Sequence, residues 1–218
     1  MIRKVFSLQP SFHLLIVDDG SPDGTGAIVK EMQAEFPDRL HLIERMGKLG
    51  LGTAYIRGFK WAMERPYRFI CEMDADFPHD PDDLIRLAKA CEDGGDMSVG
   101  SRYVEGGGVV DWTWDRKMLS YWASYYVRSV LGIKVRDTTA GFVCYRDHVL
   151  KKLDLDGVRS IGYAFQVEMK YRVVKNGFRI QEVPILFKDR TKGTSKMSMN
   201  IFSEAVVGVW RMRRIKFQ

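Results

Sequence analysis

Two pairs of aspartates stand where predicted strands end. Asp74 and Asp76 flank Ala75 directly after the strand predicted over 68–73. Carboxylates on either side of one residue can converge on a hard divalent cation, Mg²⁺ or Mn²⁺, which binds oxygen ligands and bridges phosphates. Such a cation would neutralise the charge that develops on a departing diphosphate. The alternative is a solvated acidic turn that caps a helix opening at Pro81, and the position at a strand end favours the metal.

The second acidic pair follows the strand predicted over 12–17. Asp18 and Asp19 could accept hydrogen bonds from the N–H group of a base or from ribose hydroxyls. Asp23 and Thr25, a little further along, could instead build a turn and a helix N-cap. We expect both interpretations to hold, for different residues of this run.

Basic residues suggest a partner that carries phosphate. The net charge of the chain is +6, which suits a nucleotide, a nucleic acid or an anionic lipid. In the loop 189–196, Arg190 and Lys196 could clamp phosphates, and Gly193 would let the loop move. The alternative is an ordinary solvated basic loop. Nucleic acid is not expected, because the sequence contains no RNP-like aromatic motif, zinc-finger spacing or basic recognition helix.

Strand and helix patterns alternate in the first half of the chain. Strands are predicted over 12–17, 40–44, 68–73 and 96–99, and a helix pattern follows each of the first three. This order predicts an α/β fold with a parallel sheet and helices on both faces. Ligands bind such sheets beyond the carboxyl ends of the strands, where both aspartate pairs fall.

The second half is less regular, and the length suits one domain over 1–218. The patterns predict a helix with an apolar stripe over 119–130, a helix over 164–175, and strands over 142–146 and 179–187, with Pro184 marking an edge or bulge. A last amphipathic helix covers 200–215, within the basic segment 198–218.

From the sequence we expect neither a membrane span nor a signal peptide. Its apolar runs are short against the roughly 20 residues that a transmembrane helix needs, and no apolar segment follows the first residues. Cys71, Cys91 and Cys144 form no C-x-x-C pair, so we expect reduced thiols in a cytoplasmic protein.

Together, the motifs resemble those of a known family. They are Val17-Asp18-Asp19-Gly20-Ser21-Pro22-Asp23-Gly24-Thr25, Gly47-Lys48-Leu49-Gly50-Leu51-Gly52-Thr53-Ala54, Met73-Asp74-Ala75-Asp76, His79-Asp80-Pro81, Gly100-Ser101-Arg102-Tyr103 and Asp137-Thr138-Thr139-Ala140-Gly141-Phe142. In order and spacing they are similar to those of dolichol-phosphate (polyprenol-phosphate) mannosyltransferases of glycosyltransferase family 2. The resemblance extends over about 12–199, and its specificity lies in the whole set.

The resemblance implies a GT-A fold, with a Rossmann-like, mostly parallel sheet, and an inverting transfer of mannose from GDP-mannose to a polyprenyl phosphate. It also implies site residues. The nucleotide-sugar would be bound by Val17, Asp18, Asp19, Lys48, Asp74, Ala75, Asp76, Arg190 and Lys196; Mg²⁺ or Mn²⁺ by Asp74 and Asp76; and the lipid phosphate by Arg102, Arg190 and Lys196. The catalytic residues would be Asp76, Asp137 and Arg102.

The chain departs from the family pattern in two places. The family begins with a strand that contacts the nucleotide, whereas Met1 falls where the family is already in its first helix. The fold is therefore expected to lack that strand, with unpaired neighbouring strands. In addition, Pro78 stands where many members have a glutamine that contacts the metal.

The acceptor lipid implies a membrane surface. Two segments could meet it: the aromatic and basic stretch 112–128, and the last helix. The alternative for either segment is packing in the core, and for the aromatic stretch we favour the acceptor role. We expect a peripheral protein at the cytoplasmic face of the membrane, with a small membrane subunit as a further partner.

Other functions stay open at this stage. The donor could be UDP-glucose or UDP-N-acetylglucosamine, with undecaprenyl phosphate as acceptor. A nucleotidyltransferase would share the α/β layout and carboxylate chemistry, but the opening strand leads to Asp18 and Asp19 rather than to a glycine-rich motif. A non-catalytic nucleotide-sugar-binding subunit is the third alternative.

Overall fold

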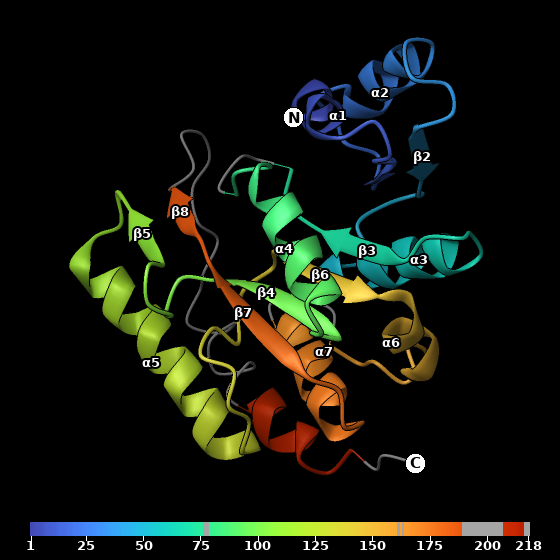
Figure 1. The fold of residues 1–218 in the computed structure, drawn as a ribbon. Coiled ribbons are helices and arrows are strands. Elements are labelled where there is room, and N and C mark those ends of the chain that lie inside the picture. Colours follow the sequence, from blue (N-terminus) through green and yellow to red (C-terminus); the bar gives the residue numbers. More distant parts are fainter. Residues whose placement is uncertain (76–78, 161, 163, 189–206, 216–218) are drawn as a thin grey trace.

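A computed structural model describes residues 1–75, 79–160, 162, 164–188 and 207–215 (Figure 1). The helices are α1 (Ile2–Leu8), α2 (Thr25–Gln33), α3 (Leu51–Met63), α4 (Asp83–Glu92), α5 (Trp114–Leu131), α6 (Asp147–Lys152) and α7 (Ala164–Lys175). The strands are β1 (Leu14–Asp18), β2 (Leu40–Glu44), β3 (Phe69–Glu72), β4 (Met97–Ser101), β5 (Gly108–Val110), β6 (Val143–Arg146), β7 (Ile180–Pro184) and β8 (Leu186–Lys188). Residues 207–212 are also helical.

The strands of the described residues form three sheets. The central sheet has the order β3-β6-β4-β7, while β1 pairs with β2 and β5 pairs with β8. All these pairs are parallel except those made by β6, which runs antiparallel to β3 and β4. The predicted α/β fold with a mostly parallel sheet is confirmed. The β1–β2 pair stands apart from the central sheet, and Figure 1 shows it with α1 and α2 at one end of the molecule.

Helices cover both faces of the central sheet. Along β6, Val143 and Tyr145 face a core shared with α3, α6 and α7, whereas Cys144 faces a core shared with α4. This alternation is the period of two expected of a strand. Because helices cover both faces of the sheet, the polar side chains that could meet a ligand lie at the ends of the strands.

The structure adjusts several predicted boundaries. The helix predicted over 119–130 begins earlier, at Trp114, and ends where Gly132 takes a φ of +65°. The strand predicted over 179–187 divides after Pro184, and β7 lies at the sheet edge as that proline indicated. The other part, β8, pairs with β5. Of the predicted last helix, 200–206 lie outside the described residues. In the part of the chain that the structure describes, no helix is long and apolar enough to cross a membrane.

Candidate active site

The predicted site residues that the structure describes lie near the carboxyl ends of the strands. Asp18, Asp74 and Arg102 lie at or just beyond the carboxyl ends of β1, β3 and β4. Since β6 runs the other way, the segment that leads into it reaches the same edge. The backbone N–H of Gly100 donates to the carbonyl of Phe142 (2.8 Å). The edge is therefore assembled from strand ends and from the residues that precede β6.

Asp18 and Asp19, at the end of β1, make different contacts. The buried Asp18 carboxylate accepts the backbone N–H of Ser21 at 3.3 Å and shapes the turn. Asp19 forms a two-pronged ion pair with Arg45, with N–O distances of 2.5 and 2.7 Å. Sequence reasoning missed Arg45, although it directly follows β2 at the same sheet edge. Asp23 accepts the N–H and hydroxyl of Thr25 and so builds the expected turn. The expected side-chain N-cap is wrong, because the N-cap residue of α2 is Gly24, and no side chain caps the helix.

Arg45 also connects this pair to α3. Its Nη1 donates to the hydroxyl of Thr53 (2.8 Å), in the first turn of the helix. The turn before α3 contains Lys48, which is exposed, and Gly50, whose φ of +98° favours glycine. Val17 lies one residue before the end of β1 and pairs with Ile43. Of the residues predicted to bind the nucleotide-sugar, Asp19 is thus linked through Arg45 to the first turn of α3, and Lys48 precedes that turn.

The same helix reaches the second acidic motif. The hydroxyl of Tyr55 donates to Asp74 Oδ1 at 3.2 Å, and a Cβ atom placed on Gly141 would lie 3.9 Å from that oxygen. Asp74 is half-buried and Ala75 is exposed. Asp76 lies outside the described residues, as do Arg190 and Lys196.

Two ionisable groups lie buried behind Asp74, and sequence reasoning missed both. Burial raises the pKa of Glu72 to about 8, although the charge of Lys170 opposes the shift. Burial likewise lowers the pKa of Lys170 to about 8, against the charges of Glu72 and Asp137. Lys170 Nζ donates to the carbonyl oxygens of Ala140 (2.7 Å) and Gln166 (3.3 Å). It therefore fixes the segment that passes beside Asp74.

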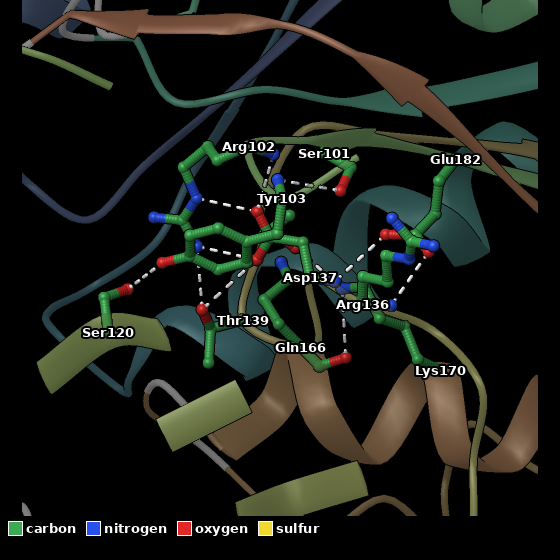
Figure 2. A network of polar contacts seen from close by, with 11 residues as sticks. Ser101, Arg102, Tyr103, Ser120, Arg136, Asp137, Thr139, Gln166, Lys170 and Glu182 are labelled. Carbon is green, nitrogen blue, oxygen red and sulfur yellow. Dashed lines mark hydrogen bonds and ion pairs between the residues drawn. The ribbon is translucent and has the colours of Figure 1, made fainter. Parts of the chain in front are cut away.

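A buried ion pair joins the end of β4 to the segment before β6 (Figure 2). Arg102 Nε and Nη2 each donate to the carboxylate of Asp137 at 2.7 Å, and the backbone N–H of Arg102 adds a third bond at 3.0 Å. Nη2 also donates to Thr139 (2.8 Å). Burial alone would raise the pKa of Asp137, but the charge and hydrogen bonds of Arg102 hold it below its ordinary value.

Aromatic rings surround the Arg102 guanidinium. Its central carbon lies 5.2 Å from the ring centre of Tyr103 and 5.5 Å from those of Trp112 and Phe187. Arg116 lies over the same Trp112 ring at 4.2 Å, so two guanidinium groups share one indole. Such contacts are favourable and keep a cation near an apolar wall. Arg116 was not among the predicted site residues. The only sequence signal for it is the basic and aromatic composition of the stretch 112–128.

Comparison with known proteins identifies close relatives. The model of the family described as glycosyl transferase family 2 matches residues 1–154. The chain is 46% identical over 215 residues to polyprenol monophosphomannose synthase of Mycolicibacterium smegmatis. The aligned region covers 98% of this chain and 81% of that protein. It is 48% identical over 202 residues to undecaprenyl-phosphate mannosyltransferase of Micrococcus luteus, with 93% and 82% covered.

Solved structures share the fold at lower identity. Glucosyl-3-phosphoglycerate synthase from Mycobacterium tuberculosis in complex with phosphoglyceric acid is 15% identical, with a TM-score of 0.61. This match covers 91% of this chain and 66% of the solved one, so the chain spans about two thirds of that length. A complex of the same enzyme with Mn²⁺, UDP and phosphoglyceric acid gives a TM-score of 0.64 at 15% identity, with 97% and 70% covered. The likeness supports the expected GT-A fold.

Proposed function

Since the chain belongs to glycosyl transferase family 2, we propose that it transfers mannose from GDP-mannose to a polyprenyl phosphate, with inversion at the sugar. The observation that carries the proposal is the shared sheet edge: the Asp74 carboxylate and the Arg102–Asp137 pair lie at the ends of β3 and β4. One offers an oxygen ligand for a metal, and the other offers cationic donors for a phosphate. The names of the two relatives supply the sugar and the lipid.

A divalent cation fits the residues at the end of β3. Asp74 provides a half-buried carboxylate, and the glycine at 141 places no side chain over it. Hard oxygen ligands of this kind suit Mg²⁺ or Mn²⁺. We assign the metal to Asp74 and Asp76, where it would neutralise charge on the leaving diphosphate. Pro78 lies outside the described residues and supplies no side-chain ligand.

The nucleotide-sugar is assigned to the first half of the edge. Val17, Asp18, Asp19 and Lys48 would border the nucleoside, with Ala75 beside the diphosphate. Arg45 keeps the Asp19 carboxylate in a fixed orientation, so its lone pairs would meet ribose or base donors in a set geometry. Arg190 and Lys196 would close over the phosphates.

The acceptor phosphate is assigned to Arg102, with Arg190 and Lys196 as further cations. Asp137 orients Arg102 through two side-chain bonds, and Nη1 of Arg102 donates no hydrogen bond to the residues that the structure describes. Arg116 brings a second guanidinium to the same indole. A polyprenyl phosphate is already anionic at neutral pH and needs no strong general base. Catalysis would therefore rest on in-line positioning and on charge stabilisation.

The acceptor also sets where the protein would work. A polyprenyl phosphate resides in a bilayer, so we expect the protein to act as a peripheral enzyme at the cytoplasmic face of a membrane. A small membrane subunit could assist it.

A transfer assay tests the proposal. Purified protein, Mn²⁺ or Mg²⁺ and a short polyprenyl phosphate are incubated in parallel with labelled GDP-mannose, UDP-glucose and UDP-N-acetylglucosamine. We expect label in the lipid fraction from GDP-mannose alone. Transfer from a UDP-sugar would replace the donor, and nucleotide-sugar binding without transfer by any of them would favour a non-catalytic subunit.

A variant pair tests the metal assignment. Asp76→Ala should abolish transfer while the protein stays folded, because one of the two carboxylates is lost. Asp80→Ala, which removes an exposed carboxylate from the same stretch, should keep most of the activity. Wild-type turnover by Asp76→Ala would refute the assignment.

A further inference from the structure

Among the residues that the structure describes, the outer side of α5 carries the densest group of exposed aromatic side chains. Trp114 is 75% exposed, Trp122 55%, Tyr125 48% and Tyr121 47%. At 100° per residue, positions 114, 121, 122 and 125 fall on one side of the helix. We call these four residues the aromatic stripe. Isolated apolar residues at a surface are ordinary, whereas a contiguous patch indicates an interaction site.

The opposite side of α5 packs in the core. Val127 and Leu131 are buried against Val167 and Tyr171 of α7 and against Val209 and Met212 of the last helical segment. Figure 1 shows α5 along the outer border of the molecule, with α7 and the last segment on its inner side. The stripe is therefore not needed for the core, which already has its own apolar residues.

The composition of the helix selects a bilayer as the occupant. Tryptophan and tyrosine have an apolar ring with a polar tip, and they concentrate at the interface between lipid tails and headgroups. The charged residues of α5 are Arg116, Lys117, Arg128 and one acid, Asp115. Basic residues beside an aromatic surface suit anionic headgroups.

The stripe is continuous with the site assigned to the acceptor phosphate. The rings of Tyr121 and Tyr103 meet edge to face at 5.7 Å, and the hydroxyl of Tyr103 donates to Ser120 on α5 at 2.6 Å. Tyr103 directly follows Arg102 (Figure 2). A lipid whose phosphate lies at Arg102 would thus have its chain beside the stripe.

We propose that the aromatic stripe of α5 docks the protein onto a bilayer that contains anionic lipid. The link to the acceptor rests on the proposed function, but docking itself does not. Docking through this side would bring Arg102 to the depth of lipid headgroups, so that the acceptor phosphate need not leave the membrane.

Vesicle binding without donor or acceptor tests docking separately from transfer. The whole chain is sedimented with phosphatidylcholine vesicles, with and without phosphatidylglycerol. In Trp114→Ala/Trp122→Ala we expect binding to fall at least about tenfold, because apolar surface that would enter the interface is lost. Lys117→Glu should weaken binding only to the anionic vesicles. Ile28→Ala removes a side chain 54% exposed on α2 and should bind like wild type.

Four results would overturn the proposal. The first is wild-type protein that does not bind anionic vesicles. The second is full binding by the double tryptophan variant. The third is loss of vesicle binding in the single variant Trp210→Ala. Trp210 is 53% exposed in the last helical segment, so this result would place the membrane contact there. The fourth is a wild-type dimer in sedimentation that becomes monomeric in the double variant, which would make a second copy the occupant. If docking is supported and transfer is absent, the proposed function fails and the docking surface stands.

Discussion

The Glu182 carboxylate accepts the backbone N–H of Asp137 at 3.0 Å, so β7 holds the residue that orients Arg102. Its other oxygen accepts the N–H of Arg136 at 2.8 Å (Figure 2). Lys170 holds the same segment at Ala140. The segment that leads into β6 is thus held by β7 and α7, in addition to the bonds from Arg102.

Glu182→Gln should destabilise the fold by about 1–3 kcal/mol, because one hydrogen bond from a backbone N–H to a charged acceptor is lost. The amide keeps one acceptor oxygen but turns an NH₂ group toward a backbone N–H. Urea unfolding measures the loss. Glu105→Gln removes an exposed carboxylate and should leave the free energy of unfolding nearly unchanged. Equal stability of the two variants would contradict this reading of the contact.

The Arg102–Asp137 pair should matter more. Arg102→Met leaves the Asp137 carboxylate buried without its cation, which costs about 3–5 kcal/mol in comparable pairs. Lys117→Met, at an exposed lysine of α5, is the control and should change stability little. A loss below about 1 kcal/mol in Arg102→Met would show that solvent reaches the pair.

The same pair predicts a dependence on pH. Because the pKa of Asp137 is lower in the folded protein than in the unfolded chain, its contribution is complete above the unfolded value of about 3.9. It is lost as the pH falls through the folded value. The stability gap between wild type and Asp137→Asn should therefore be constant from pH 7 to about 5 and shrink in stronger acid. A gap that widens in acid would contradict the depressed pKa.

Tyr55→Phe should lower transfer more than it lowers stability. The variant loses the hydroxyl that donates to Asp74 but keeps the ring that stacks on Phe165 at 5.6 Å. With the Asp74 carboxylate less well oriented, we expect a higher Mn²⁺ requirement and several-fold lower turnover at low metal. Tyr67→Phe, whose ring packs against His13 and Trp61, is the control. Unchanged metal dependence in Tyr55→Phe would remove Tyr55 from the site.

The sequence predicted the features that depend on local pattern. Apolar runs and the aspartates that follow them located β1 and β3, and glycine-rich motifs located the turn before α3. The direction of β6 and the partners of Asp19 and Asp137 depend on contacts between distant segments. Glu72 and Lys170 were missed for the same reason, because only the packing of α7 beneath β3 and β6 makes an ordinary glutamate and lysine buried neighbours.

Two glycines of α3 give predictions of opposite sign. A Cβ atom on Gly52 would lie 2.5 Å from the carbonyl oxygen of Ser160 and 2.7 Å from the Phe165 ring. Gly52→Ala should therefore cost about 1–3 kcal/mol through overpacking. On Gly58 the nearest atoms, in Leu15 and Val17, lie at 3.7 Å, which is an ordinary contact. Gly58→Ala should stabilise the helix by up to about 1 kcal/mol.

The pair also tests whether α3 positions the site. The first two turns of α3 carry Thr53, which binds Arg45, and Tyr55, which binds Asp74. A displaced helix would disturb both contacts, so Gly52→Ala should lose transfer even under conditions where it is fully folded. Gly58→Ala should keep wild-type transfer. If Gly52→Ala were destabilised but fully active when folded, α3 would act only as a packing element. The contacts of Thr53 and Tyr55 would then not contribute to transfer.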